Sequence, residues 1–163
     1  MEIMLAGGDT MNPYERLQEH AESEGLIVKE FQLESSDGRI MGNRIAIRKD
    51  IPTSIQKAGT LAEELGHYHT SVGCILDQTD QQNRKQECQA RLWGYNKMIG
   101  LTGIINAFKA KCQNKHEIAE YLEVTDEYLK ECIDCYRNKY GVYTTVDNYI
   151  IYFIPSLAVI ELI

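Results

Sequence analysis

The first clear pattern along the chain is an apolar residue at every third or fourth position after residue 12. This spacing gathers the apolar side chains on one face of a helix. The residues of this face are Tyr14, Leu17 and Ala21. Asn12 suits the N-cap of such a helix, Pro13 suits its first position, and Gly25 is expected to end it.

Two short strands are predicted after this helix. The first covers residues 26–31, which are mostly apolar. The Ser-Ser-Asp-Gly sequence at residues 35–38 is typical of a turn. The second strand covers residues 44–48, where Ile45 and Ile47 alternate with polar neighbours, as in a half-buried strand.

A longer helix is predicted to follow, with Thr53 or Ser54 at its N-cap. Its apolar face is formed by Ile55, Ala58, Ala62 and Leu65. Gly66 has no side chain, so we expect a strand or a loop to pack closely against the helix at this point.

The second half of the chain is predicted to be mostly helical. Residues 77–85 are polar and show no apolar period, so we interpret them as a loop. A helix is expected from near Asn83 to Gly100, and a shorter one around residues 104–108. Two further helices are expected between residues 116 and 140.

The end of the chain carries its own boundary signals. Thr125 is expected to cap the second helix of the pair, and Gly141 is expected to end it. Residues 143–153 alternate enough to form a strand, which we expect to pair with the strand at residues 44–48. The predicted fold class is therefore α+β: a mainly helical domain with a small β-sheet and a C-terminal helix pair.

Composition favours a single globular domain. The chain has 163 residues, of which 44% are hydrophobic and 25% are charged. We predict one domain over residues 1–163, with residues 1–10 as a candidate disordered leader. No basic, apolar leader peptide opens the chain and no apolar stretch is long enough to cross a bilayer, so we expect a cytoplasmic protein that does not contact membranes. Five cysteines, an odd number, agree with a reducing compartment.

The net charge of −7 argues against direct binding of nucleic acid, which depends on cationic contacts to phosphate. Residues 118–132 resemble a helix-turn-helix motif, but its second helix begins with Asp126 and Glu127 instead of cations and amides. We interpret the motif as a structural helix pair or a protein-docking surface. An acidic surface is also suited to attract a basic protein partner.

The densest group of candidate metal ligands and acid/base residues lies at residues 61–69. Glu63 and His67 are four residues apart and share one helix face, and Glu64 lies next to them. This is the geometry of the H-E-x-x-H helix of metallopeptidases, with a glutamate in place of the first histidine. Taken alone, the same pattern is also typical of an ordinary acidic helix.

A catalytic zinc ion usually has three protein ligands, so a third must come from elsewhere. Glu87, on the next long helix, is the best candidate, because Ala90 and Trp93 follow it at packing spacing. His69 points away from His67 if the helix continues, and turns back to the metal only if the helix ends. Cys74 is a further candidate ligand, although a lone cysteine is more often a small buried apolar residue.

Two segments resemble the ImmA/IrrE family of metallo-endopeptidases. Residues 62–67, A-E-E-L-G-H, are similar to the family signature A-H-E-(I/L)-G-H, and residues 86–94 resemble its E-x-x-A-N-x-F-A segment. The resemblance implies a zincin-like domain in which Glu64 is the general base and Glu63, His67 and Glu87 bind the metal. It also implies a protein substrate, a phage-repressor-type helix-turn-helix regulator cut at a limited site.

The chain departs from the family at Glu63, which replaces a ligand histidine. One imidazole and two carboxylates would form a neutral site with Zn²⁺, which makes the ion a weaker Lewis acid. Oxygen ligands also shift the preference toward Mn²⁺ or similar ions. The alternative is therefore a weakly active or inactive metallopeptidase-like module that regulates a repressor by binding it. If hydrolysis occurs, Tyr68 or another tyrosine is a candidate to stabilise the oxyanion.

Overall fold

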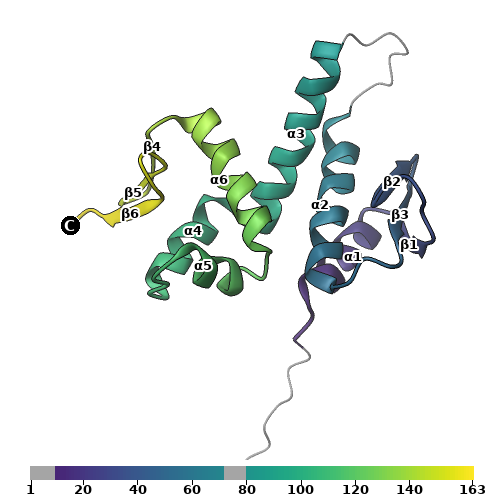
Figure 1. Ribbon diagram of the computed structural model, residues 1–163, viewed down its shortest axis with the longest axis horizontal. Helices are drawn as coiled ribbons and strands as arrows, with labels where there is room; N and C mark the ends of the chain where they lie inside the picture. The colour runs from purple at the N-terminus through teal and green to yellow at the C-terminus, as the bar shows by residue number, and fades with distance from the viewer. Residues whose placement is uncertain (1–9, 72–79) are drawn as a thin grey trace, which may run out of the picture.

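The computed structural model describes residues 10–71 and 80–163 of the chain. A long helix, α3 (Asp80–Met98), runs through the middle of the molecule (Figure 1). One helix-and-sheet region lies on each side of it, and the two three-stranded sheets are at opposite ends of the molecule.

The N-terminal region combines two helices with the first sheet. Its elements in chain order are α1 (Pro13–Ser23), β1 (Ile27–Phe31), β2 (Gly38–Met41), β3 (Arg44–Arg48) and α2 (Ser54–Thr70). In the sheet, β3 is central, with β1 parallel and β2 antiparallel to it. This leaves β2 as an edge strand. Within this region, α2 is the helix that packs against α3 (Figure 1).

The helix starts in this region follow the capping signals of the sequence. The Asn12 side chain accepts a hydrogen bond from the Glu15 backbone N–H, and the Glu15 carboxylate accepts one from the Asn12 N–H. Thr53 caps α2 by accepting a hydrogen bond from the Gln56 N–H. The predicted start of the first helix and the strand at residues 44–48 are confirmed.

Strand β2 was not predicted, because residues 35–38 were interpreted as a turn. Gly38 is instead the first residue of β2, and a turn with Gly42 at φ +58° connects β2 to β3. A positive φ is a conformation that glycine adopts without steric cost. The Gly42 turn therefore lets β2 fold back and pair with β3 in an antiparallel hairpin.

Helices α2 and α3 pack in very close contact at Gly66. A Cβ atom on this glycine would lie only 2.1 Å from the backbone oxygen of Ala90. On the other side of the contact, a Cβ on Gly94 would lie 3.3 Å from the Ala62 carbonyl. The element that approaches Gly66 is thus a helix, not the predicted strand or loop.

Helix α3 begins earlier than the sequence pattern indicated. Residues 80–85 were expected to be a loop, but they form the first turns of α3; residues 77–79 of that predicted loop lie outside the described residues. Residues 80–85 are all exposed, because this end of the helix extends beyond the body of the protein (Figure 1). A helix that buries no face needs no apolar period, so the absence of one did not exclude a helix.

The C-terminal region is formed by three helices and the second sheet. Its elements are α4 (Gly100–Lys109), α5 (Lys115–Tyr121), α6 (Asp126–Tyr140), β4 (Tyr143–Val146), β5 (Tyr149–Tyr152) and β6 (Ala158–Glu161). Thr125 caps α6 by accepting a hydrogen bond from the Tyr128 N–H, and Gly141 ends the helix, as predicted.

The predicted pairing of the last strand with the strand at residues 44–48 is wrong. Residues 143–153 contain two strands, β4 and β5, which pair with each other in an antiparallel hairpin, and β6 adds to β5. The turn is Asp147-Asn148, with Asp147 at φ +51°. Asp and Asn tolerate this conformation, so two adjacent residues of these types are a hairpin signal.

Two clusters of buried residues lie on the two sides of α3. The N-terminal core includes Ile45 and Leu65, and the C-terminal core includes Tyr136 and Phe153. Met98 packs against both cores, so α3 connects them. The α+β fold class is confirmed, with two small sheets instead of one. Within the described residues, no helix combines the length and the apolar character needed to cross a membrane.

Candidate functional site

The structure brings the three predicted metal ligands together. Glu63 and His67 lie one helical turn apart on α2, and Glu87 approaches them from α3. One ligand atom from each residue lies within 4.8 Å of the others, and His67 Nε2 is 3.6 Å from Glu87 Oε2. We call Glu63, His67 and Glu87 the first triad.

The close α2–α3 contact explains this convergence. His67 follows Gly66 directly, and Glu87 lies one helical turn before Ala90, whose backbone touches Gly66. The two helix axes can approach so closely only because position 66 has no side chain. Residues twenty positions apart in the sequence therefore become neighbours at one point.

Glu64 lies beside the first triad, under the edge strand β2. A Cβ atom on Gly38 would lie 2.7 Å from Glu64 Oε1, so the glycine leaves room for this carboxylate. Burial, with further contributions from the negative charges of Glu63 and Glu87, raises the pKa of Glu64 to about 7. A carboxyl with this pKa can both accept and release a proton near neutral pH.

Arg91 is a residue of the site that the sequence patterns did not single out. Its Nε lies 3.6 Å from Glu63 Oε1, and it follows Glu87 by one helical turn. The guanidinium partly neutralises the two carboxylates of the first triad. The signal that could have identified it is the four-residue spacing Glu87-x-x-x-Arg91 on a helix already expected to face α2.

A cavity of about 650 Å³ opens next to the first triad, between the start of β2, α2, α3 and α6. Glu63 and Glu64 line it on one side, Arg91 on another, and Tyr128 and Glu131 of α6 face them. The cavity is large enough to hold several side chains of an extended peptide. Only part of the first triad borders it, since His67 and Glu87 are not among its lining residues.

Two tyrosines line this cavity, Tyr95 and Tyr128, and Tyr68 is not among its lining residues. Tyr68 is exposed and packs edge-on against the ring of His69, at 5.1 Å between centroids. Burial raises the pKa of Tyr128 well above its ordinary value, so its phenol stays protonated at neutral pH. Tyr95 beside it donates a hydrogen bond to Glu131 Oε2 at 3.3 Å.

His69 does not join the first triad. Helix α2 continues to Thr70, so His69 points away from His67, and its Nε2 lies 2.9 Å from Glu24 Oε2. Cys74 lies outside the described residues. Cys132 is fully buried in the C-terminal core, where burial raises the pKa of its thiol to about 12, and Cys135 packs against the same core.

The first triad fits a divalent ion by its donor set and its geometry. Zn²⁺ binds histidine nitrogen and carboxylate oxygen at roughly 2.0–2.2 Å, which places neighbouring ligand atoms about 3.3 Å apart. The 3.6 Å between His67 Nε2 and Glu87 Oε2 reaches this value with a small side-chain rotation. The Arg91 guanidinium acts against the fit, because it already occupies one side of the Glu63 carboxylate.

No family model, no curated protein and no solved structure matches the chain. Its function is therefore inferred from the residues of the site and their geometry.

Proposed function

We propose that the protein is a metal-dependent endopeptidase with a zincin-like site, as the resemblance to ImmA/IrrE proteins implies. The observation that carries the proposal is that Glu87 lies against His67, beside the half-buried Glu64, whose pKa is raised. A purely structural acidic helix would not need a third ligand-type side chain from a different helix at this point.

Glu63, His67 and Glu87 would hold the ion, with Zn²⁺ or Mn²⁺ suited to a mixed nitrogen and oxygen donor set. A bound ion would supply Lewis-acid activation for hydrolysis of a peptide bond. Glu64 accepts the proton of the attacking water and donates it to the leaving amide nitrogen. Tyr128, which lines the cavity, would donate a hydrogen bond to the oxygen of the scissile carbonyl.

The substrate we propose is a basic protein of the phage-repressor type, with a helix-turn-helix domain. The whole chain carries a net charge of −7, and acidic side chains from α2, from α6 and from the segment before β2 line the cavity. These acidic residues are Asp37, Glu63, Glu64, Glu127 and Glu131. Proteins that bind DNA carry cationic surfaces, so charge complementarity would favour their approach.

The experiment is a cleavage assay with purified repressors of this type, using enzyme prepared without chelator and analysed for bound metal. We expect limited cleavage that stops when the ion is removed and returns when Zn²⁺ or Mn²⁺ is added. Glu64→Gln should retain the ion and lose cleavage. Absence of metal at every stage of purification, or undiminished cleavage by Glu64→Gln, would remove the proposal.

A second candidate function is regulation of a repressor by binding without hydrolysis. The contact of Arg91 with Glu63 favours it, because this pair weakens the metal affinity of a site that already lacks one histidine. Glu63→His distinguishes the two functions. A gain of cleavage in this variant, starting from a wild type that only binds the repressor, would support the second candidate.

A further inference from the structure

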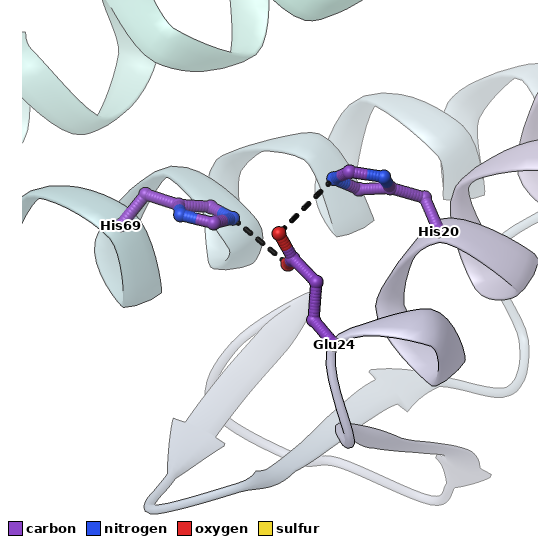
Figure 2. A group of neighbouring side chains, drawn as sticks. All are labelled: His20, Glu24 and His69. Carbon is purple, nitrogen blue, oxygen red and sulfur yellow. Dashed lines mark hydrogen bonds and ion pairs between the residues drawn. The ribbon is translucent and has the colours of Figure 1, made fainter.

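A second group of metal-ligand side chains lies on the opposite side of α2 from the first triad. His20 comes from the last turn of α1, Glu24 is the residue that caps α1, and His69 comes from the last turn of α2 (Figure 2). One ligand atom of each lies within 4.8 Å of the others. We call His20, Glu24 and His69 the second triad.

The carboxylate of Glu24 lies between the two imidazole rings, with one oxygen directed at each (Figure 2). Its Oε1 is 3.6 Å from His20 Nε2, and its Oε2 is 2.9 Å from His69 Nε2. These two distances lie on either side of the roughly 3.3 Å between neighbouring ligands of a tetrahedral Zn²⁺ ion. Small side-chain rotations would therefore bring all three donor atoms to one ion.

The rings of the second triad are held in place before any ion binds. The indole of Trp93, on α3, stacks on His69 with 4.6 Å between centroids and 15° between planes. The ring of His20 lies at 6.4 Å from the same indole. Each of the three ligand side chains is only 27–29% exposed. A preorganised site loses less side-chain entropy when the ion binds.

We propose that the second triad is a binding site for one divalent transition-metal ion, with Zn²⁺ as the best match. Two imidazoles and one carboxylate are a zinc donor set that also leaves a fourth position open. Because the ligands come from the ends of α1 and α2, the ion cross-links the two helices. The site is independent of the first triad, since His69 lies two residues beyond His67 and therefore on another face of α2.

The test is a calorimetric titration of the full chain with Zn²⁺, compared between matched histidine variants. The wild type is expected to bind two ions, and His67→Asn and His69→Asn one ion each. His20→Asn should behave as His69→Asn does. Zn²⁺ should raise the melting temperature of His67→Asn through the second triad alone, and this rise should disappear when His69→Asn is added.

Two further variants provide controls. Glu24→Gln keeps the shape of the side chain and one acceptor oxygen, so it should fold normally and still lose one ion. His116→Asn changes an exposed histidine that pairs with Asp126, and it should leave two ions bound.

The outcomes separate this inference from the proposed function. If the wild type binds one ion that His69→Asn removes and His67→Asn does not, the second triad is a metal site and the first is not. If the amount of bound Zn²⁺ is unchanged in His20→Asn, Glu24→Gln and His69→Asn, the second triad is a hydrogen-bonded contact between helices and the inference is wrong.

Discussion

The two triads use the same helix and the same kinds of side chain, yet their surroundings differ. The first has one histidine and two carboxylates, borders a cavity, and has the half-buried Glu64 as its neighbour. The second has two histidines and one carboxylate, and it packs against the Trp93 indole. By ligand type alone, the second triad is the better zinc site.

The comparison of the two triads indicates that the type of ligand and the capacity for catalysis are separate properties of a site. A hydrolytic site needs a proton acceptor beside the ion and space for a substrate, and only the first triad has both. Among the described residues, the ion pairs of the second triad include no further carboxylate, and none of its three members lines the cavity. We therefore propose catalysis at the first triad and a cross-linking role for an ion bound by the second.

The largest expected effect comes from a Glu→Gln substitution made once beside the first triad and once within the second. Glu64→Gln should reduce the rate of repressor cleavage by about 10²–10⁴-fold, because it removes the proton acceptor, while the number of bound ions stays the same. Glu24→Gln should do the reverse, with one ion lost and cleavage retained. Cleavage rates and Zn²⁺ stoichiometry of both variants check the pair. If Glu64→Gln and Glu24→Gln lost cleavage equally, the proposed difference in function between the two triads would be wrong.

Gly66→Ala should disrupt the first triad and leave the second triad intact. A methyl group at this position meets the Ala90 backbone, so α2 and α3 must move apart, at a cost of about 1–3 kcal/mol or more in the free energy of unfolding. The first triad, which spans the two helices, should lose its ion, whereas the second should keep His20, Glu24 and His69 together.

The control for this prediction is Gly59→Ala on the same helix. A Cβ there would meet only the ring of Tyr128, at 3.3 Å, so a small change in stability is expected. Denaturant unfolding and ion stoichiometry measure both variants. A Gly66→Ala protein as stable as Gly59→Ala, with both ions bound, would contradict the close helix contact.

Trp93→Leu is expected to weaken the second triad selectively. Loss of the ring that stacks on His69 should lower Zn²⁺ affinity there by about tenfold, the lower range for groups that orient metal ligands. Trp93→Phe keeps an aromatic face and should have a smaller effect. The measurement is Zn²⁺ titration of each variant in a His67→Asn background. Greater weakening by Phe than by Leu would show that ring stacking is not the cause.

The smallest expected effect is at Arg91. Arg91→Gln removes a cation that competes for Glu63, so Zn²⁺ should bind the first triad more tightly, by up to about fivefold as for the loss of an exposed ion pair. Titration in a His69→Asn background isolates this site. Weaker binding would instead mean that Arg91 positions Glu63 as a ligand.

Local signals in the sequence were sufficient for most elements and for the first triad. Asn12 and Pro13 mark the start of α1, and alternation around Ile45 marks β3, because caps and strand faces depend on neighbouring residues. The pairing of Glu63 with His67 follows from helical spacing alone. Glu87 required a further step, the assumption that the next helix crosses this one, and the distance of 3.6 Å agrees with it.

Three elements were not predicted from the local sequence pattern: the start of α3, strand β2 and the hairpin of β4 and β5. Residues 80–85 form a fully exposed stretch of helix, which leaves no apolar pattern to detect. The edge strand β2 depends on its pairing with β3, and the hairpin of β4 and β5 depends on the turn at Asp147. For residues 80–85 and for β2, the deciding interaction is with solvent or with a neighbouring strand, whereas the Asp147-Asn148 turn is a local signal that the alternation pattern did not use.

Sequence periodicity placed Glu63 and His67 on one helix face, with Glu64 next to them, because helix geometry fixes the direction of each side chain. It could not show that His20 and Glu24 meet His69, forty-five or more residues away, because that contact depends on how α1 packs against α2. Nor could it show that Gly66 allows α3 close enough for Glu87 to reach His67. Contacts between helices are decided by the packing of their surfaces, and this packing exists only in the folded chain.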